Sequence, residues 1–472
     1  MNYLPTKSRL LTEVRESLIL ALPLAGAQLA QSATGFVDTV MMGVLGSTTI
    51  AAGGLGAVTF NGLVLITSAI LSAVSPLVAE AYGAQQPQQA AQVTRQGLWL
   101  AVIMTIPLML ILWNGNALLQ QLGQTPETAR LAEVYLRAIV WGCFPALAFA
   151  VLRSFVSALS QPRPIMVIVI AGTLLNIGGN YVLMFGKFGL PALGLAGIGW
   201  ASTLSLWSMF LALTGYALWN PTLRSYQIFH QLQQFQSKVM RELLLVGLPI
   251  GGLVMVETGL FTITTFLMGQ LGTVTLAAHQ IALQTAAITF TGALGISFAT
   301  TVRVGQLGGQ GDVRGMRLAG LVGIGLGGLF MAIMGVLFWF VPDRIVALYL
   351  DVHNPANNAV VHLARRLLGV AAVFQIVDGL QVTAAGALRG LKDTRIPMAI
   401  GFFAYWCIGL TTGYLLGIPL GFAGVGLWWG LAIGLLVAAV VLTIRFLHLS
   451  DRLIHATHST AALIPRQSSN LP

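Results

Sequence analysis

The stretch Arg15-Glu-Ser-Leu-Ile-Leu-Ala-Leu-Pro23 returns 226 residues later as Arg241-Glu-Leu-Leu-Leu-Val-Gly-Leu-Pro249, and this repetition decides the fold. A second pair, Gly194-Leu-Ala-Gly-Ile-Gly199 and Gly421-Phe-Ala-Gly-Val-Gly426, recurs with a shift of 227 near the end of each half. The chain of 472 residues is therefore a duplication of one unit. Further pairs under the shift of 226 are Met42 with Met268, Gly43 with Gly269, and Gly46 with Gly272.

Long apolar segments make up both copies of the unit. Hydrophobic residues account for 56% of the sequence and charged residues for 8%, against about 25% charged residues in soluble domains. This composition excludes a water-soluble globule, and a count of 2 cysteines excludes a disulfide-rich scaffold. The segments are too long for β-barrel strands of about 10 residues, so we predict helices. The predicted spans are 17–41, 51–79, 96–119, 134–158, 165–186, 193–219, 242–268, 276–302, 316–341, 363–388, 396–416 and 423–447.

The number of spans in each copy determines how the two copies are related. Because six is even, both copies enter the membrane from the same side, and the repeat is parallel about an axis along the membrane normal. We therefore predict an all-α polytopic membrane protein with twelve transmembrane helices in two parallel six-helix repeats. A central cavity is expected between the halves.

Basic residues indicate the orientation in the membrane. Of the 24 Lys and Arg residues, 18 fall at the termini and in the even-numbered connections. Cytoplasmic loops retain Lys and Arg, so both termini are expected in the cytoplasm, with the protein in the cell (inner) membrane. The net charge of +10 is explained in this way, and no basic cluster interleaved with aromatics predicts nucleic-acid binding.

The repeat and the composition divide the chain into five parts. The segment 220–240 carries apolar residues at helical spacing among glutamines, which predicts an interfacial linker helix. The polar tail has too little apolar content to pack, so we expect it to be disordered. The parts are a cytoplasmic N-terminus (1–16), an N-lobe (17–219), the cytoplasmic linker (220–240), a C-lobe (241–448) and a cytoplasmic tail (449–472).

Three carboxylates lie well inside apolar segments: Asp38, Glu257 and Asp378. An ionised group near the bilayer centre costs about 2.5 to 3.5 kcal/mol, so each needs a partner, a proton or water. The alternative for each is a carboxylate that only hydrogen-bonds neighbouring helices. For Asp38, near the end of its segment, solvation at the interface is a further alternative.

The repeat relates these acids to polar residues in the other half. Glu257 corresponds to Gln31, and Asp38 corresponds to Thr264. Gln31 and Asp38 are seven residues apart, as are Glu257 and Thr264, so the two residues of one half lie on one face of their helix, two turns apart. We infer that this face lines the interior in both halves, and that the lobes differ in function, one for the coupling ion and one for the cargo.

Neutral oxygens accompany Asp38 in the same half. Asn176 and Asn180 are four residues apart, and Thr203 follows in the next span. Amide and hydroxyl oxygens suit Na⁺, a hard cation, so these residues and Asp38 form a candidate cation-coupling site. Hydrogen bonding between helices is the equally weighted alternative for each asparagine.

A polar stripe in the tenth span predicts a substrate site. Gln375 and Gln381 flank Asp378 at helical spacing. A hydrated carboxylate among aromatics attracts a lipophilic cation, so Gln31, Asp38, Glu257 and Phe261 join this stripe as candidate substrate contacts. For Phe261, a position in the core or facing lipid is a stronger interpretation than substrate contact.

Other chemistries lack their motifs. No Gly-Lys-Ser/Thr phosphate loop is present, so ATP is not expected to drive the protein. The histidines do not cluster at metal-ligand spacing, so we expect no tightly bound metal and no cofactor. His279 is interpreted as a hydrogen-bonding residue at a helix interface. No catalytic set suggests an enzyme.

The sequence resembles the multidrug and toxic compound extrusion (MATE) family, in its NorM-like branch. The resemblance covers about residues 10 to 450. Three motifs carry it: Val377-Asp378-Gly-Leu-Gln381-Val-Thr-Ala-Ala-Gly386-Ala-Leu-Arg389-Gly390-Leu-Lys392-Asp393-Thr394, Val37-Asp38-Thr39-Val-Met-Met-Gly43, and Gly247-Leu-Pro249 followed by Glu257.

The resemblance implies a cation-coupled antiporter with two lobes around a V-shaped cleft, which exports organic cations by alternating access. It implies that Glu257 and Asp378 serve coupling and drug contact in the C-lobe, and Asp38 in the N-lobe. Asn176, Asn180 and Thr203 resemble the ion-binding positions of the N-lobe. Some members carry an acid where this chain has Asn180, which leaves the N-lobe site weaker. A seventh-helix glutamate is typical of the NorM-like branch.

Several other functions are compatible with a polytopic chain. Within transporters, the alternatives are a lipid-linked oligosaccharide flippase, which needs a cationic cavity, and a narrow-specificity metabolite exporter. The chain lacks the paired catalytic set of an intramembrane enzyme, and a structural membrane protein would not need three buried carboxylates. A channel is a further alternative, but no ring of filter residues repeats around an axis. We expect small organic cations and membrane lipid as partners, H⁺ or Na⁺ as the coupling ion, and a monomer.

Overall fold

The computed structural model describes residues 7–462, and the part of the chain that it describes is helical and contains no strand. The N-terminal half comprises α1 (Lys7–Val44), α2 (Ser47–Leu71), α3 (Val74–Gly83), α4 (Pro87–Trp113), α5 (Gly115–Gln121), α6 (Pro126–Ile139), η1 (Val140–Gly142), α7 (Cys143–Ala158), α8 (Arg163–Phe185) and α9 (Leu195–Trp219). After α10 (Pro221–Arg224), the C-terminal half comprises α11 (Ser237–Gln270), α12 (Thr273–Gly309), α13 (Val313–Phe340), α14 (Pro342–Ala347), η2 (Pro355–Asn357), α15 (Asn358–Gly390), α16 (Arg395–Phe402), the π-helical η3 (Phe403–Leu410), α17 (Thr411–Gly417) and α18 (Ala423–Ala462).

Eleven helical segments within residues 7–462 are long and apolar enough to cross a membrane. Several of these segments consist of consecutive helices, such as α2 with α3 and α6 with α7. The helix α1 is not among the eleven, because polar residues interrupt its apolar run: Gln28, Gln31, Ser32 and Asp38. It has 38 residues and packs against α8 and α12, so it completes the predicted twelve-helix arrangement.

The duplication extends to the backbone conformation. Gly46 precedes α2 with φ 117° and ψ 165°, and Gly272 precedes α12 with φ 112° and ψ 164°. Positive φ is available to glycine at no steric cost, so both copies use the same residue for the same turn. Gln85 and Gly311, also 226 residues apart, both have positive φ after α3 and α12. The two repeats predicted from the sequence are confirmed.

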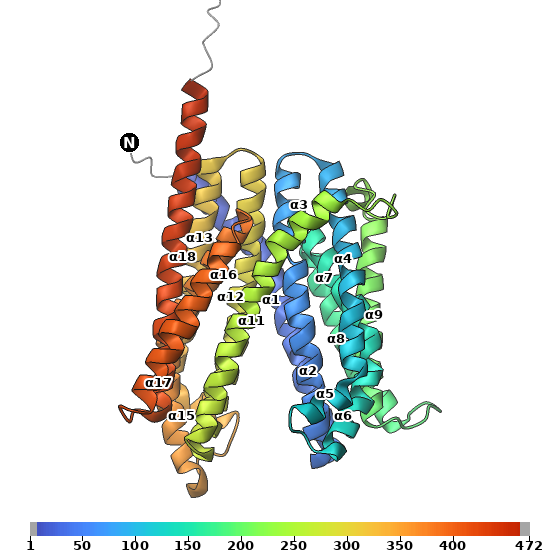
Figure 1. Cartoon of the computed structure of the whole chain (residues 1–472), viewed down its shortest axis with the longest axis vertical. Coiled ribbons are helices and arrows are strands. Elements are labelled where there is room, and N and C mark those ends of the chain that lie inside the picture. The colour runs from blue at the N-terminus through green and yellow to red at the C-terminus, as the bar shows by residue number, and fades with distance from the viewer. Residues whose placement is uncertain (1–6, 463–472) are drawn as a thin grey trace, which may run out of the picture.

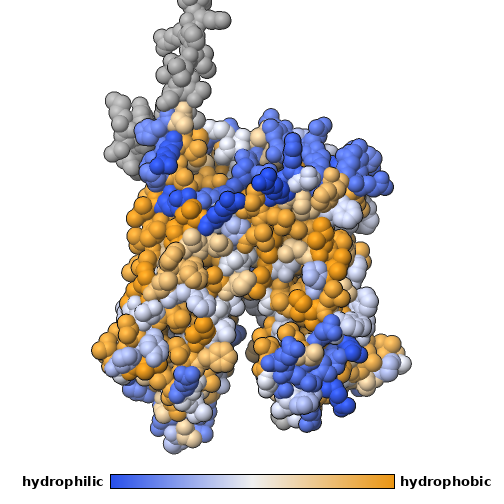
Figure 2. Space-filling model, in the orientation of Figure 1, coloured by the Kyte–Doolittle hydropathy of each residue, from blue (hydrophilic) through white to orange (hydrophobic). Residues whose placement is uncertain are grey.

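The two halves form separate lobes that converge at one end and diverge at the other (Figure 1). The converging end holds the start of α1, the connection between the lobes and the extension of α18. Figure 2 shows a hollow between the lobes that opens at the opposite end, with hydrophilic residues gathered at the converging end. This is the V-shaped cleft that the resemblance implies.

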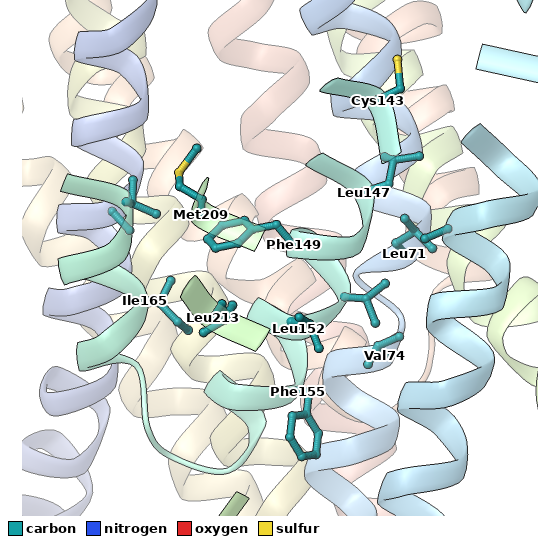
Figure 3. Packing of buried hydrophobic residues seen from close by; sticks show 14 of the residues in the cluster. Leu71, Val74, Cys143, Leu147, Phe149, Leu152, Phe155, Ile165, Met209 and Leu213 are labelled. Atoms are coloured by element: carbon teal, nitrogen blue, oxygen red, sulfur yellow. The ribbon is translucent and has the colours of Figure 1, made fainter. Parts of the chain in front are cut away.

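Each lobe has its own hydrophobic core. In the N-lobe, Leu147, Leu152 and Phe155 of α7 are completely buried and pack among α2, α8 and α9 (Figure 3). In the C-lobe, Trp428 and Phe446 of α18 are completely buried against α12, α13 and α15. The N-lobe cluster also takes in residues of α11 and α12, among them Ile250 and Ile296, so apolar packing continues across the lobe interface.

Close helix contacts and ion pairs join the lobes at the converging end. A Cβ on Gly83 would lie 1.9 Å from the carbonyl oxygen of Gln306, and one on Gly309 would lie 2.1 Å from that of Glu80. Only glycine permits this approach of α3 and α12. The Arg303 guanidinium donates two hydrogen bonds to the carboxylate of Glu13, at 2.8 Å and 2.6 Å. The cleft is therefore closed at this end by backbone packing and charge.

The predicted linker helix in 220–240 is wrong. Only α10 is helical before α11 begins at Ser237, and turns occupy the residues between them. Gln227 and Gln231 have positive φ, which breaks a helix. The apolar side chains still pack on the N-lobe, because Ile228 is 2% exposed and Tyr226 contacts Phe155 edge to face. The segment is a packed loop and not an amphipathic helix.

The predicted disorder of 449–472 is wrong for its first part. The helix α18 continues to Ala462. Ser450 is completely buried, and Asp451 forms an ion pair with Arg317 of α13. These contacts offset the polar composition. Residues 463–472 lie outside the described residues, as do residues 1–6, and α1 begins at Lys7 inside the predicted N-terminal segment 1–16.

Candidate functional site

Asp38 is the centre of a polar cluster in the N-lobe. It is 8% exposed and lies on α1 beside α8 and α9. The Asn180 side-chain amide donates a 2.6 Å hydrogen bond to Oδ1 of Asp38, and the Ser202 hydroxyl donates one of 3.3 Å to Oδ2. Asn176 donates to Ser202 at 3.0 Å and accepts from Asn180 at 3.2 Å. Three helices thus converge on one carboxylate.

Oxygen atoms dominate this cluster. The side-chain oxygen of Asn180, Oδ1, is buried and has no hydrogen-bond partner among the described residues. Unpaired buried acceptors are costly, and this one lies beside the carboxylate of Asp38. The arrangement suits a small hard cation, for which amide, hydroxyl and carboxylate oxygens are the preferred ligands.

One predicted member does not join the N-lobe cluster. The Thr203 hydroxyl donates a 2.8 Å hydrogen bond to the carbonyl oxygen of Ala138 on α6, so it makes no contact with Asp38. Its neighbour Ser202 takes the place beside the carboxylate. Tyr135 of α6, completely buried and close enough to Asp38 for electrostatic interaction, is a further residue that sequence reasoning missed.

The C-lobe holds the other two membrane carboxylates. Glu257 on α11 is half-buried and Asp378 on α15 is 4% exposed, and the two interact electrostatically. Four side-chain oxygens at this site, one of them from Asp378 itself, are buried without a hydrogen-bond partner among the described residues. They are Oδ1 of Asp378, Oε1 of Gln375, Oε1 of Gln381 and the hydroxyl oxygen of Tyr405. The C-lobe site therefore gathers four unpaired oxygens, whereas the N-lobe cluster around Asp38 has one, the side-chain oxygen of Asn180.

The depth of the C-lobe acids follows from the helix contacts. A Cβ on Gly251 would lie 2.5 Å from Ile70 of the N-lobe, so α11 touches the other lobe there. Glu257 lies six residues further along, about 9 Å at 1.5 Å per residue. Asp378 lies one turn from Val382, whose carbonyl oxygen accepts from Ser297 on α12. Ser297 is two residues from Gly295, which packs against α1 of the N-lobe. Both acids therefore lie where the lobes begin to separate.

Asp38 lies at a different depth from the C-lobe acids. On α1, Ala25 is the residue against which Gly295 of α12 packs, with a Cβ distance of 2.7 Å. Asp38 is thirteen residues beyond Ala25, about 20 Å along the helix. The two candidate sites are therefore in different lobes and at different levels of the cleft.

An aromatic and hydrogen-bonded chain supports the C-lobe site. Phe261 contacts Phe374 at a ring separation of 6.2 Å, and Phe374 contacts Trp428 at 5.4 Å. The indole nitrogen of Trp428 donates to Nδ1 of His279 at 3.2 Å, and Nε2 of His279 bonds Thr265 at 3.0 Å. His279 is completely buried, which confirms the prediction that it is a hydrogen-bonding interface residue.

The remaining predicted substrate contacts are only partly assembled. Gln375 donates to the Thr289 hydroxyl on α12, which orients its amide toward the core of the C-lobe. Gln31 is exposed on α1. Within residues 7–462 no group of three His, Cys, Asp or Glu side chains could hold a metal ion.

Comparison with known proteins identifies the family. The sequence model of the MatE family matches residues 23–182 and 249–415, one block in each lobe. A probable multidrug resistance protein NorM from Synechocystis sp. is 49% identical over 434 residues, covering 92% of this chain and 94% of that protein. Another of the same name from Pseudomonas aeruginosa is 42% identical over 455 residues, covering 96% and 93%.

Solved structures show the same fold. The eukaryotic MATE transporter AtDTX14 has a TM-score of 0.80 at 20% identity, covering 94% of this chain and 100% of that one. A MATE protein in the bent conformation has a TM-score of 0.85 at 19% identity, covering 96% and 98%. Fold, internal repeat and sequence agree, so the chain is a multi-pass membrane protein of the MatE (MATE) family of transporters.

Proposed function

We propose that this protein is a secondary active multidrug efflux antiporter, which exports organic cations in exchange for H⁺ or Na⁺ by alternating access. The observation that carries the proposal is the pairing of Glu257 with Asp378 among unpaired oxygens, at the level where the lobes separate. Two acids and several acceptors form a site that either an organic cation or a small cation can neutralise. Competition for the same charge is the basis of antiport.

The N-lobe cluster is a second binding position for the coupling ion. Asp38 supplies one negative charge, and Asn176, Asn180 and Ser202 supply neutral oxygens. One charge is sufficient for a monovalent ion or a proton. The names of the relatives, probable multidrug resistance proteins, support drugs as the class of cargo.

The exchange follows from charge. A cation from the outside occupies the carboxylates in the state that is open outward, lowers their negative charge, and displaces the bound organic cation. The lobes then reorient about the contacts at the converging end. Each positive charge moved inward is worth about 2.3 kcal/mol per 100 mV, equivalent to roughly a 50-fold concentration gradient.

The orientation belongs to this proposal. The converging end, where α1 begins and the linker lies, is hydrophilic (Figure 2) and holds basic residues such as Arg9, Arg303 and Arg445. The positive-inside rule puts that end, and with it both termini, in the cytoplasm of a cell with an inner membrane. The cleft in the structure then opens to the outside, the state in which cargo leaves and the coupling ion enters.

A flippase for lipid-linked oligosaccharides requires a large cationic cavity, and one feature of the structure bears on this alternative. Arg153 and Arg389 line a cavity between the lobes, but its volume is about 30 Å³. A pyrophosphate carrying a sugar does not fit this volume. The open cleft contains acids instead, so we favour cationic cargo over an anionic lipid.

Ethidium efflux from proteoliposomes tests the proposal, with an imposed inward Na⁺ gradient in one arm and an inward H⁺ gradient in the other. We expect efflux under one gradient that is lost in Asp378→Asn. The matched control is Asp351→Asn, an aspartate in an exposed loop, which should retain wild-type flux.

Two results would contradict the proposal. The first is absence of efflux under both gradients from correctly inserted protein, which would favour a flippase or a narrow metabolite exporter. The second is wild-type flux in Asp378→Asn, which would make that carboxylate structural. Loss of folded Asp378→Asn protein would also assign it a structural role, and Glu257→Gln would then test the pair.

A further inference from the structure

A cavity between the lobes, separate from the acids of the cleft, is lined by two arginines. Arg153 comes from α7 of the N-lobe and Arg389 from the end of α15 in the C-lobe. Both guanidinium groups contact the ring of Phe298 on α12, whose centroid is 5.6 Å from Cζ of Arg153 and 6.0 Å from Cζ of Arg389. The two guanidinium carbons are therefore at most about 12 Å apart.

Neither arginine has a carboxylate partner within hydrogen-bonding or ion-pair distance in the described part of the chain. Arg153 donates to Oε1 of Gln28 at 3.0 Å, and Arg389 donates to Ser297 at 3.0 Å and to the carbonyl oxygen of Ala385 at 3.4 Å. Glu257 acts on Arg389 electrostatically, but the two do not come within ion-pair distance in the described part of the chain. A guanidinium has five N–H donors, so both side chains retain donors for another ligand.

Several other basic residues at this end are paired with acids. Arg303 binds Glu13, Arg9 binds Asp312, and Arg445 binds Asp393. Lys392 lies 2.6 Å from Glu80. The two arginines at the cavity are less exposed to solvent than Arg9, and nevertheless lack such a partner. Burial of an unpaired charge is unfavourable, and arginine cannot lose its proton to avoid it.

The cavity limits the size of an occupant. Its volume is about 30 Å³, and one water needs roughly 10–15 Å³. This space admits a monatomic anion and excludes a drug-sized molecule. Ser75 also lines the cavity, and its hydroxyl makes no hydrogen bond within residues 7–462. The other wall hydroxyls donate to backbone carbonyl oxygens: those of Ser72, Ser154, Ser157 and Thr301.

We propose that a small inorganic anion of the chloride type binds in this cavity and bridges Arg153 of the N-lobe to Arg389 of the C-lobe. The anion neutralises two like charges that would otherwise repel each other across the lobe interface. Because the two ligands belong to different lobes, the complete site exists only while the converging end is closed. The proposal is independent of the cargo and of the coupling ion.

Thermal unfolding of the full-length purified protein tests anion binding. Potassium chloride is compared with potassium gluconate at equal ionic strength and pH, so that Na⁺ and the general effect of salt do not contribute. We expect a saturable rise of about 2 °C or more in the unfolding midpoint with chloride for the wild type. Arg153→Gln and Arg389→Gln should each lose this rise. Arg163→Gln, an exposed arginine on α8, should retain it.

A bromide soak of wild-type crystals provides the second measurement, and it needs no variant to fold. We expect an anomalous peak between the guanidinium groups of Arg153 and Arg389. No chloride-dependent rise in the wild type, an unchanged rise in both arginine variants, or the absence of a bromide peak would each overturn the proposal.

Discussion

The side-chain amide of Asn180 donates a 2.6 Å hydrogen bond to Oδ1 of Asp38, while its own carbonyl oxygen remains unpaired. The pair joins α8 to α1 and is the shortest link in the N-lobe cluster of Asp38, Asn176, Asn180 and Ser202. An amide holds the carboxylate in place but adds no charge to the site.

Asn180→Asp should tighten Na⁺ binding at the N-lobe site on the order of tenfold or more, because a second negative charge about 4 Å from a cation contributes several kcal/mol at an effective dielectric constant near 20. The measurement is the unfolding midpoint as a function of Na⁺ concentration at pH 8. Asn354→Asp, in an exposed loop, is the control. An Na⁺ dependence identical to that of the wild type would contradict the prediction.

Glu257 and Gln31 occupy equivalent positions in the repeat, but their surroundings differ. Glu257 interacts electrostatically with Asp378 and Arg389, whereas Gln31 is exposed on α1. Glu257→Gln should lower drug efflux at least about tenfold, since a lost interaction of 1.4 kcal/mol already has that effect. Adding Gln31→Glu should not restore transport. Efflux rates normalised to expressed protein test both, and recovery in the double variant would show that the lobes are interchangeable.

Gly83→Ala should destabilise the closed end of the cleft. The new Cβ would lie 1.9 Å from the backbone oxygen of Gln306, and backbone cannot move aside as a side chain can. We expect a loss of about 1–3 kcal/mol in unfolding free energy, as in overpacked cores. Gly62→Ala is the matched control, since its Cβ would meet nothing within 4 Å. Equal unfolding midpoints for the two variants would disprove this account of the interface.

Trp428→Phe should destabilise the C-lobe through a lost hydrogen bond. The substitution leaves Nδ1 of the completely buried His279 without a donor, at a cost of about 1–3 kcal/mol. The neighbouring Trp429 is 41% exposed, and Trp429→Phe should change stability by about 0.5 kcal/mol or less. Unfolding of both variants in detergent is the test. A larger effect for Trp429→Phe would contradict the assignment.

Much of the fold could be predicted from the sequence because the signals are local. A span of about 20 apolar residues must be helical in a bilayer, where each backbone polar group needs an internal partner. The repeat is visible in residues such as Pro23 and Pro249, and its turns need glycine at Gly46 and Gly272. The three membrane carboxylates were conspicuous for the same reason, since a charge in an apolar segment demands an explanation.

Local signals failed where a residue's partner lies far away in the chain. The linker has helical spacing of apolar residues, but its contacts with the N-lobe keep it as a loop, with Trp99 donating to the carbonyl oxygen of Leu232. The polar end of α18 remains helical because Asp451 pairs with Arg317 and Ser450 is buried. Composition alone does not report such tertiary contacts.

By itself, the sequence determined the class of the protein: a duplicated, twelve-helix membrane transporter with acids at Asp38, Glu257 and Asp378. Only the tertiary structure decided which neighbours those acids have, that Ser202 and not Thr203 contacts Asp38, and that Arg153 and Arg389 line one cavity between the lobes. The physical reason is that membrane helices are apolar on nearly all sides. Their periodicity does not specify which face meets which neighbour, and close packing of small residues between helices makes that choice.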